Sequence, residues 1–125
     1  IDLLDASGVH RGGLIMPGAR TVLSSLGKAE QLFPGAGDDL QAVAREPKAL
    51  TTNTQDALLA GAIFAIQGGV KAAIREQARQ IGVKIETLPI LLTGGDLGML
   101  KLDKLQTHVV PDLVLDGLQA LAEKR

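Results

Sequence analysis

"NTQDALLAGAIFAIQGGVKAAIREQARQI", residues 53–81, is the stretch that decides the fold of this chain. Its apolar residues recur at the spacing of one helix face, Asn53 stands at an N-cap position with Asp56 three residues later, and Gly82 supplies a stop. At 1.5 Å per residue the helix would be roughly 40 Å long, longer than a domain of this size needs for itself. The apolar face comprises Leu58, Leu59, Ala62, Ile63, Ile66, Val70, Ala73, Ile74 and Ala78.

Three glycines interrupt the middle of this helix, namely Gly61, Gly68 and Gly69. Each costs about 1 kcal/mol relative to alanine in a helix interior. That cost is explained if another helix or backbone segment packs closely there, or if the helix bends. The chain as a whole is glycine-rich, with 15 glycines among 125 residues.

The segments on either side predict a hairpin and a helix before the long helix, and alternating strands and helices after it. The order is that of a layered α/β domain. The predicted elements are strands at 1–5 and 13–16, a helix at 19–32, a brief helical or irregular connection before Pro47, the long helix, a strand at 90–92, a short helix at 97–102, a strand at 107–110, and a final helix capped by Asp112. The predicted buried side of that last helix consists of Leu115, Leu118, Leu121 and Ala122.

The amino-acid composition limits the classes of function that this chain can have. A hydrophobic content of 46% over 125 residues is enough for one core, and a net charge of −1 without basic clusters argues against nucleic acid or an anionic membrane as partner. No uninterrupted apolar run reaches the ~18 residues of a membrane span. Cysteine is absent, which removes disulfides and thiolate chemistry and fits a cytoplasmic protein.

Groups that carry catalytic chemistry are scarce. His10 follows a predicted turn and His108 lies in a predicted strand, and neither belongs to a cluster with metal-ligand spacing. No serine stands in a nucleophile elbow. We therefore expect no catalytic residue and no metal site within this chain.

Three motifs remain. In residues 93–96, "TGGD", the two glycines either turn the chain or let a nucleotide approach the backbone after a strand. Residues 12–18, "GGLIMPG", are locally typical of a bulged strand and a Pro-Gly turn. Capping explains Asn53, while Thr54 beside it would keep a hydroxyl free for a ligand.

Taken in order, the motifs resemble the C-terminal half of type III pantothenate kinases, a family that also includes proteins named Bvg accessory factors. The resemblance covers essentially the whole chain. The residues that carry it are Gly8, Gly12, Gly13, Ile15, Pro17, Gly18, Asn53, Thr54, Asp56, Ala57, Gly61, residues 93–96 and residues 112–118.

The resemblance implies a fold and an activity. The fold is the ribonuclease-H-like C-terminal domain of the actin and sugar-kinase ATPase superfamily, a mixed sheet flanked by helices, here as one domain over residues 1–125 without its first strand. The activity is transfer of the γ-phosphoryl group of ATP to pantothenate, the first step of coenzyme A synthesis. Mg²⁺ and a monovalent cation, K⁺ or NH₄⁺, are implied as cofactors, and a cytoplasmic homodimer as the assembly.

The same resemblance implies residue roles. Thr93, Gly94, Gly95 and Asp96 form the adenosine-binding motif. Thr54 contacts pantothenate from the neighbouring subunit. The dimer interface includes Gly12, Gly13, Pro17 and Gly18, with Gly61 and Gly68 on the long helix.

Motifs that the family carries in its N-terminal half do not occur here. These are the Asp-x-Gly-Asn-Thr phosphate loop, the Gly-x-Asp-Arg segment with the catalytic Asp, and the Asp-x-Gly-Thr second phosphate motif. Because phosphoryl transfer needs positioned phosphate ligands, metal ions and a base, we expect this chain to be inactive without that half. The alternatives are a non-catalytic dimerisation or regulatory module, and another sugar-kinase-like ATPase.

Overall fold

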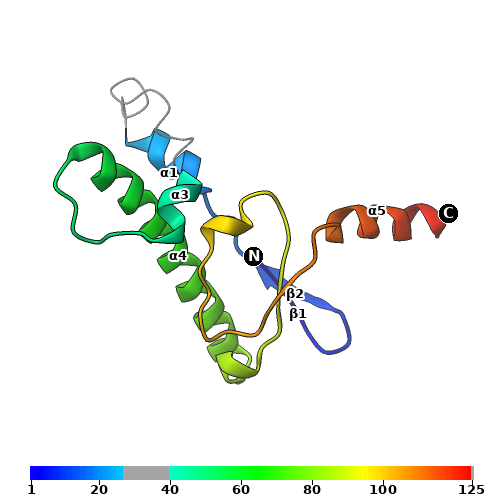
Figure 1. The fold of residues 1–125 in the computed structure, drawn as a ribbon. Helices are drawn as coiled ribbons and strands as arrows, with labels where there is room; N and C mark the ends of the chain where they lie inside the picture. Colours follow the sequence, from blue (N-terminus) through cyan, green and yellow to red (C-terminus); the bar gives the residue numbers. More distant parts are fainter. Residues whose placement is uncertain (27–39, 125) are drawn as a thin grey trace.

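The computed structural model describes residues 1–26 and 40–124. A long helix, α4, forms the spine of the molecule, with two short helices at one end, the strands along its other part, and α5 extending away from them (Figure 1). The elements are β1 (Asp2–Leu4), β2 (His10–Gly13), α1 (Ala19–Ser25), α3 (Leu40–Arg45), α4 (Thr54–Gln80), the 3₁₀ turn η2 (Ile85–Thr87), β3 (Ile90–Leu92), the 3₁₀ turn η3 (Leu97–Met99), β4 (Thr107–Val109) and α5 (Leu113–Glu123).

The prediction for α4 is confirmed at both ends. The Asn53 side-chain oxygen accepts a hydrogen bond from the Asp56 backbone N–H at 2.9 Å, and its amide nitrogen donates to the Asp56 carboxylate at 2.7 Å. At the other end Gly82 adopts a φ of 73°, and its N–H donates to the carbonyl oxygen of Arg79. A glycine with positive φ just after the last turn is a common way to end a helix.

The hydrophobic core lies where α1, α3 and η3 meet the first half of α4. The predicted apolar face of α4 supplies buried Leu59, Ala62 and Ile63, while Leu40 of α3 is completely buried. The other members of this cluster are Ala19, Leu23, Ala44 and Met99. The core is thus built mainly from helix contacts.

The strands form two separate two-stranded sheets, which corrects the expectation of one mixed sheet. β1 and β2 pair antiparallel, with Asp2 opposite Gly13, and β3 and β4 pair parallel, with Ile90 opposite Thr107. The wholly apolar sequence of β3 is typical of a strand in the middle of a sheet, but β3 pairs with β4 only and leaves the Leu91 side chain 54% exposed. A central strand needs a partner on both edges, and the described residues supply one.

Several boundaries also differ from prediction. The second strand is His10–Gly13 rather than 13–16, because the Asp5 carboxylate accepts hydrogen bonds from the backbone N–H groups of Ser7 and Val9 and so tightens the turn. The helix predicted at 19–32 ends at Ser25, and the part of that prediction from residue 27 onward lies outside the described residues. The helix predicted at 97–102 is the single turn η3.

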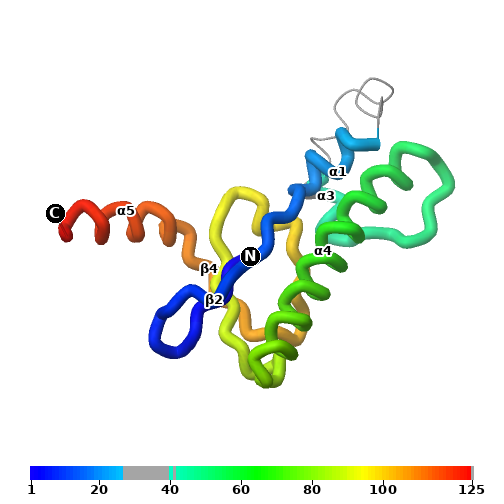
Figure 2. The backbone as a smooth tube through the Cα atoms, turned by 180° about the vertical axis from the view of Figure 1, so that it is seen from behind, coloured from blue at the N-terminus to red at the C-terminus, as the bar shows by residue number. Residues whose placement is uncertain are grey.

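The predicted start of α5 after Asp112 is confirmed, but its predicted burial is wrong. Asp112 occupies the N-cap position without a side-chain capping bond, and no residue of α5 is buried. Leu115, Leu118 and Leu121 are 63%, 59% and 65% exposed. Both views show α5 as an arm that leaves the strands and extends away from the other helices (Figures 1 and 2).

α4 is the one helix in the described part of the chain that is long and apolar enough to cross a membrane, so the expectation that no segment would pass such a test is corrected. In the structure 39% of its most apolar stretch is buried within the chain. Core helices of globular proteins meet the same criterion, and α4 packs against α1 and α3.

Candidate functional site

The glycine loop, defined as residues 93–96, follows directly from the end of β3. Gly94 has a φ of 106°, a conformation that favours glycine. A Cβ atom at Gly94 or Gly95 would meet no atom within 4 Å, so the backbone of the loop faces open space. The space beside these two Cα atoms is therefore open.

Thr93 is anchored to the segment that leads into α5. Its hydroxyl donates a hydrogen bond to the carbonyl oxygen of Pro111, with 3.1 Å between the oxygens. This bond joins the end of β3 to the end of β4, 18 residues later. The geometry gives the Thr93 hydroxyl a positioning role.

Asp96 lies at the far end of the glycine loop, where its carbonyl oxygen accepts a bond from the Met99 N–H at 2.9 Å. Its carboxylate makes no capping bond to η3. A Cβ atom on Gly18 would lie 4.0 Å from the Asp96 side-chain oxygen, so the Pro17–Gly18 turn borders the glycine loop. The structure thus brings two of the three sequence motifs together.

The segment 12–18 needs its glycines for backbone geometry. Gly12 has a φ of 124°. A Cβ on Gly13 would lie 2.5 Å from the Asp2 carboxylate and from the Ile1 carbonyl oxygen, so β1 leaves no room for a side chain there. Further along, Met16 reaches α4, where its terminal methyl would lie 2.7 Å from a Cβ on Gly69.

The third motif lies elsewhere. Thr54 is the exposed first residue of α4, whereas the glycine loop connects to α4 near Gln67, whose amide donates to the Met99 carbonyl oxygen at 2.8 Å. Thirteen residues of helix separate Thr54 from Gln67, about 20 Å along the axis. Within the described chain, Thr54 and the glycine loop are therefore too far apart to contact the same small molecule.

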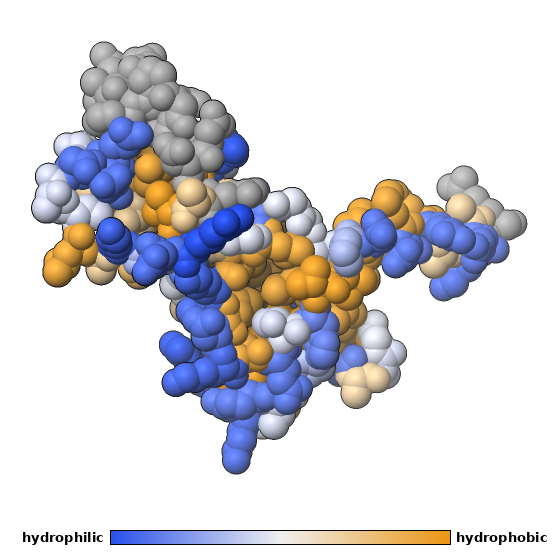
Figure 3. Space-filling model, in the orientation of Figure 1, coloured by the Kyte–Doolittle hydropathy of each residue, from blue (hydrophilic) through white to orange (hydrophobic). Residues whose placement is uncertain are grey.

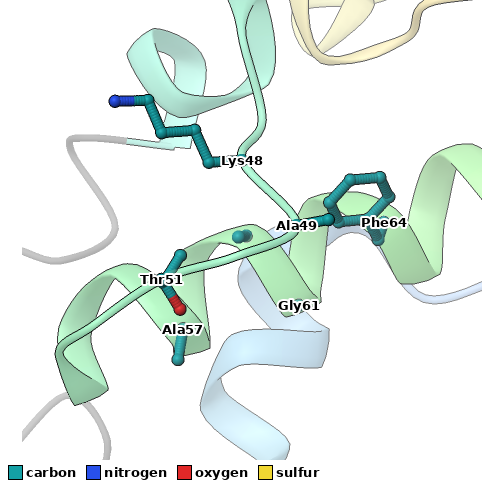
Figure 4. Close-up of a pocket in the computed structure, with 7 residues that line it drawn as sticks. Lys48, Ala49, Thr51, Ala57, Gly61 and Phe64 are labelled. Carbon is teal, nitrogen blue, oxygen red and sulfur yellow. The ribbon is translucent and has the colours of Figure 1, made fainter.

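A shallow hollow of about 270 Å³ lies beside the start of α4 (Figure 4). The connection from α3 runs across the outward face of α4 there, with Phe64 at one end and Thr51 and Ala57 at the other. The lining residues are Lys48, Ala49, Thr51, Ala57, Ala60, Gly61 and Phe64. The sequence reasoning missed Lys48, Thr51 and Phe64; the large aromatic at position 64, off the predicted apolar face, was the available signal.

Gly61 and Gly68 lie on the outward face of α4, where a Cβ atom would meet nothing within 4 Å. Exposed Ala57, Gly61, Phe64 and Gly68 follow one another at spacings of four, three and four residues. This is the spacing of a seam between two packed helices. The connection from α3 lies beside its first part, at Ala57, Gly61 and Phe64, and a Cβ atom at Gly68 would meet none of the described residues.

The titratable groups with shifted pKa values lie away from the glycine loop. Hydrogen bonds from Arg79 and then Gln80 lower the pKa of Glu76 to about 2, and the Ser7 hydroxyl is the main cause that lowers the pKa of Asp5. Both carboxylates are explained by local partners, so neither marks an acid–base catalyst.

Within residues 1–26 and 40–124, no three His, Asp or Glu side chains gather as metal ligands would. His10 pairs with Asp2 at 3.0 Å, while His108 lies exposed in β4. The acidic pair at positions 38 and 39 lies outside the described residues.

The fold therefore defines a small mixed α/β protein with an open glycine loop after a parallel strand. The family model for type III pantothenate kinase matches residues 1–76. The chain belongs to the type III pantothenate kinase family. The matched range includes the 12–18 segment, Thr54 and most of α4.

Individual relatives extend the similarity through the glycine loop. The type III pantothenate kinase of Leptothrix cholodnii is 36% identical over 128 residues, and that of Albidiferax ferrireducens 34% over 125, each covering all of this chain. The enzyme of Rubrobacter xylanophilus is 33% identical over 121 residues, 94% of the chain. These alignments span 44%, 46% and 44% of the relatives, so the chain spans less than half of their length.

Proposed function

We propose that this chain is the adenosine-binding and dimerising half of a cytoplasmic type III pantothenate kinase. The complete protein phosphorylates pantothenate with ATP in the first step of coenzyme A synthesis. The observation that carries the proposal is the open glycine loop, with Gly94 at a φ of 106°, in a chain of this family. The N-terminal half of the same protein completes the active site.

The glycine loop fits an adenosine. Gly94 and Gly95 present bare backbone, and Asp96 adds exposed carboxylate oxygens next to the Pro17–Gly18 turn. ATP, when bound, supplies the phosphoryl group that is transferred. Thr93 holds the loop in place through Pro111, so its contribution to ATP binding is positional.

Thr54 serves pantothenate bound at a neighbouring subunit. The distance of about 20 Å along α4 separates it from the region of its own glycine loop. Its exposed position at the first turn of α4 leaves the hydroxyl accessible, because Asn53 performs the capping.

The dimer interface includes the outward face of α4. Gly61 and Gly68 allow the backbone of a second α4 to approach closely, and this contact offsets their cost to helix stability. Gly12 and Gly13 give the neighbouring hairpin its shape, and Pro17 and Gly18 turn it towards α1. The hollow beside Phe64 would be covered in such a dimer.

Catalysis belongs to the other half. The described residues form no carboxylate cluster for Mg²⁺ or for K⁺ or NH₄⁺, and their shifted carboxylates are not placed at the glycine loop. Phosphoryl transfer requires phosphate ligands and a group that orients the attacking hydroxyl. We therefore expect no kinase activity from the chain alone.

A non-catalytic dimerisation or regulatory module is the second candidate. The exposed seam on α4 favours it as much as it favours a kinase, since both need a dimer. Another sugar-kinase-like ATPase is less favoured, because the relatives described above are all type III pantothenate kinases.

The test measures ATP-dependent phosphorylation of pantothenate by the longer protein that contains both halves and by this chain alone. We expect activity only in the longer protein. Replacing Thr54→Ala there should raise the KM for pantothenate, and Thr52→Ala, a neighbouring exposed threonine, is the matched control. Activity in the isolated chain would refute the division of labour, and an inactive longer protein that still dimerises would favour the accessory module.

A further inference from the structure

The helix α5 has the composition of a buried helix in an exposed position. Val114, Leu118 and Leu121 recur at spacings of four and three and share a face with Leu115, while Asp116, Ala120 and Glu123 lie opposite. All of these residues are exposed. Because an isolated helix of 11 residues is marginal in water, α5 requires a surface to cover its apolar face.

The segment before α5 is anchored to the strands, while α5 itself extends away from them. The Val110 N–H donates to the Leu92 carbonyl oxygen at 2.8 Å, and the Thr93 hydroxyl donates to the Pro111 carbonyl oxygen at 3.1 Å. These bonds fasten residues 110 and 111 to the end of β3. From there α5 leads outward in both views (Figures 1 and 2).

The helix α5 also lies away from the proposed dimer seam on α4. α4 and α5 lie on opposite sides of the strands in the two opposed views. The hydrophobic surface gathers over the middle of the molecule and continues onto the α5 arm (Figure 3). Leu91 of β3 and Val109 of β4, both more than half exposed, belong to the strands from which α5 departs.

We propose that the apolar face of α5, with Val114, Leu115, Leu118 and Leu121, docks on the N-terminal half of the longer protein. The relatives contain more than half of their length beyond the part that this chain matches, which supplies an occupant of sufficient size. The inference rests on the proposed function only in assuming that such a half is present. Docking would join the two halves directly after the segment that anchors the glycine loop.

The experiment is hydrogen–deuterium exchange of the α5 amides, in the longer protein and in this chain alone. We expect exchange at least about tenfold slower in the longer protein, since burial of one leucine corresponds to that factor or more. Leu118→Asp should abolish the protection. Ala120→Asp, which places the same charge on the opposite face, should preserve it.

Three outcomes would overturn the proposal. Equal, fast exchange in both proteins would show that the N-terminal half does not cover α5. Protection in the isolated chain that grows with protein concentration would identify a second copy as the occupant. Concentration-independent protection in the isolated chain would mean that α5 packs on its own strands.

Pantothenate phosphorylation by the unmodified longer protein is measured in parallel. Protection of α5 without kinase activity would remove the proposed function and leave the docking intact. Kinase activity without protection of α5 would leave the proposed function intact and refute the docking.

Discussion

The side-chain amide of Gln67, in the middle of α4, donates a hydrogen bond to the backbone carbonyl oxygen of Met99, 2.8 Å away and buried. Gln67 is the one buried polar side chain among the described residues. Met99 ends the short turn that begins at the glycine loop. The bond therefore fixes the loop to the helix that carries the proposed dimer seam.

Replacing Gln67→Met should destabilise the protein by about 1–3 kcal/mol, because the side-chain volume is kept while the Met99 carbonyl oxygen is left buried without its donor. Urea unfolding measures the change. Gln106→Met, at an exposed position, is the control and should leave the midpoint unchanged. Equal midpoints for both variants would contradict this role for Gln67.

The two glycines of the loop should differ in how much stability is lost when each is changed to alanine. Gly94→Ala forces a side chain into a φ of 106° and should cost about 1–3 kcal/mol of stability. Gly95→Ala meets open space and should leave the unfolding midpoint nearly unchanged. If adenosine lies on this backbone, Gly95→Ala should nevertheless raise the KM for ATP in the longer protein. A normal KM would argue against the adenosine assignment.

Gly68 offers a test of the dimer seam in which two effects have opposite signs. In a monomer Gly68→Ala should stabilise α4 by about 1 kcal/mol, since the new methyl meets no atom within 4 Å. In a dimer with close helix packing, the methyl should cost about 1–3 kcal/mol of association. Sedimentation at several concentrations, together with thermal unfolding, distinguishes the two.

Gly117→Ala is the matched control for Gly68→Ala, because it adds a methyl to an exposed helix position with equally open surroundings. It should stabilise its helix without changing the association of two copies. If Gly68→Ala also leaves association unchanged, the proposed seam on α4 is wrong.

The accuracy of the sequence predictions depended on whether the signal was local. Asn53, Asp56 and Gly82 determine the ends of α4 through contacts within a few residues, and the structure confirms them. The start of α5 after Asp112 was equally predictable. Its burial was not, because burial of Leu118 depends on a surface that the described chain does not provide.

The strand errors have the same physical origin. The apolar residues at 14–16 suggested a strand, but the turn set by Asp5 selects His10–Gly13 as the partner of β1. The glycine loop was recognisable as a motif. The loop also lies near Gly18 and is connected to Gln67 through Met99. These are long-range contacts, and the spacing of residues in the sequence does not predict them.

Asp5 should make the stability of the hairpin depend on pH. The Ser7 hydroxyl, the Val9 and Ser7 backbone N–H groups and Arg11 hold the pKa of this carboxyl below its ordinary value of 3.8. A lowered pKa in the folded state contributes stability that is present above the unfolded pKa and is lost as the pH falls through the folded pKa. Asp5→Asn should thus be less stable than the parent protein at pH 7, and the difference should begin to shrink as the pH falls below about 4.

Urea midpoints of the two proteins between pH 7 and pH 3 measure this difference. Asp103→Asn, at an exposed carboxylate for which the structure shows no side-chain hydrogen bond, is the control and should track the parent protein throughout. Because the other carboxylates are common to the parent and the variants, their titration cancels in the comparison. A difference between Asp5→Asn and the parent that stays constant through acid pH would assign the turn's stability to its backbone geometry instead of the ionised carboxylate.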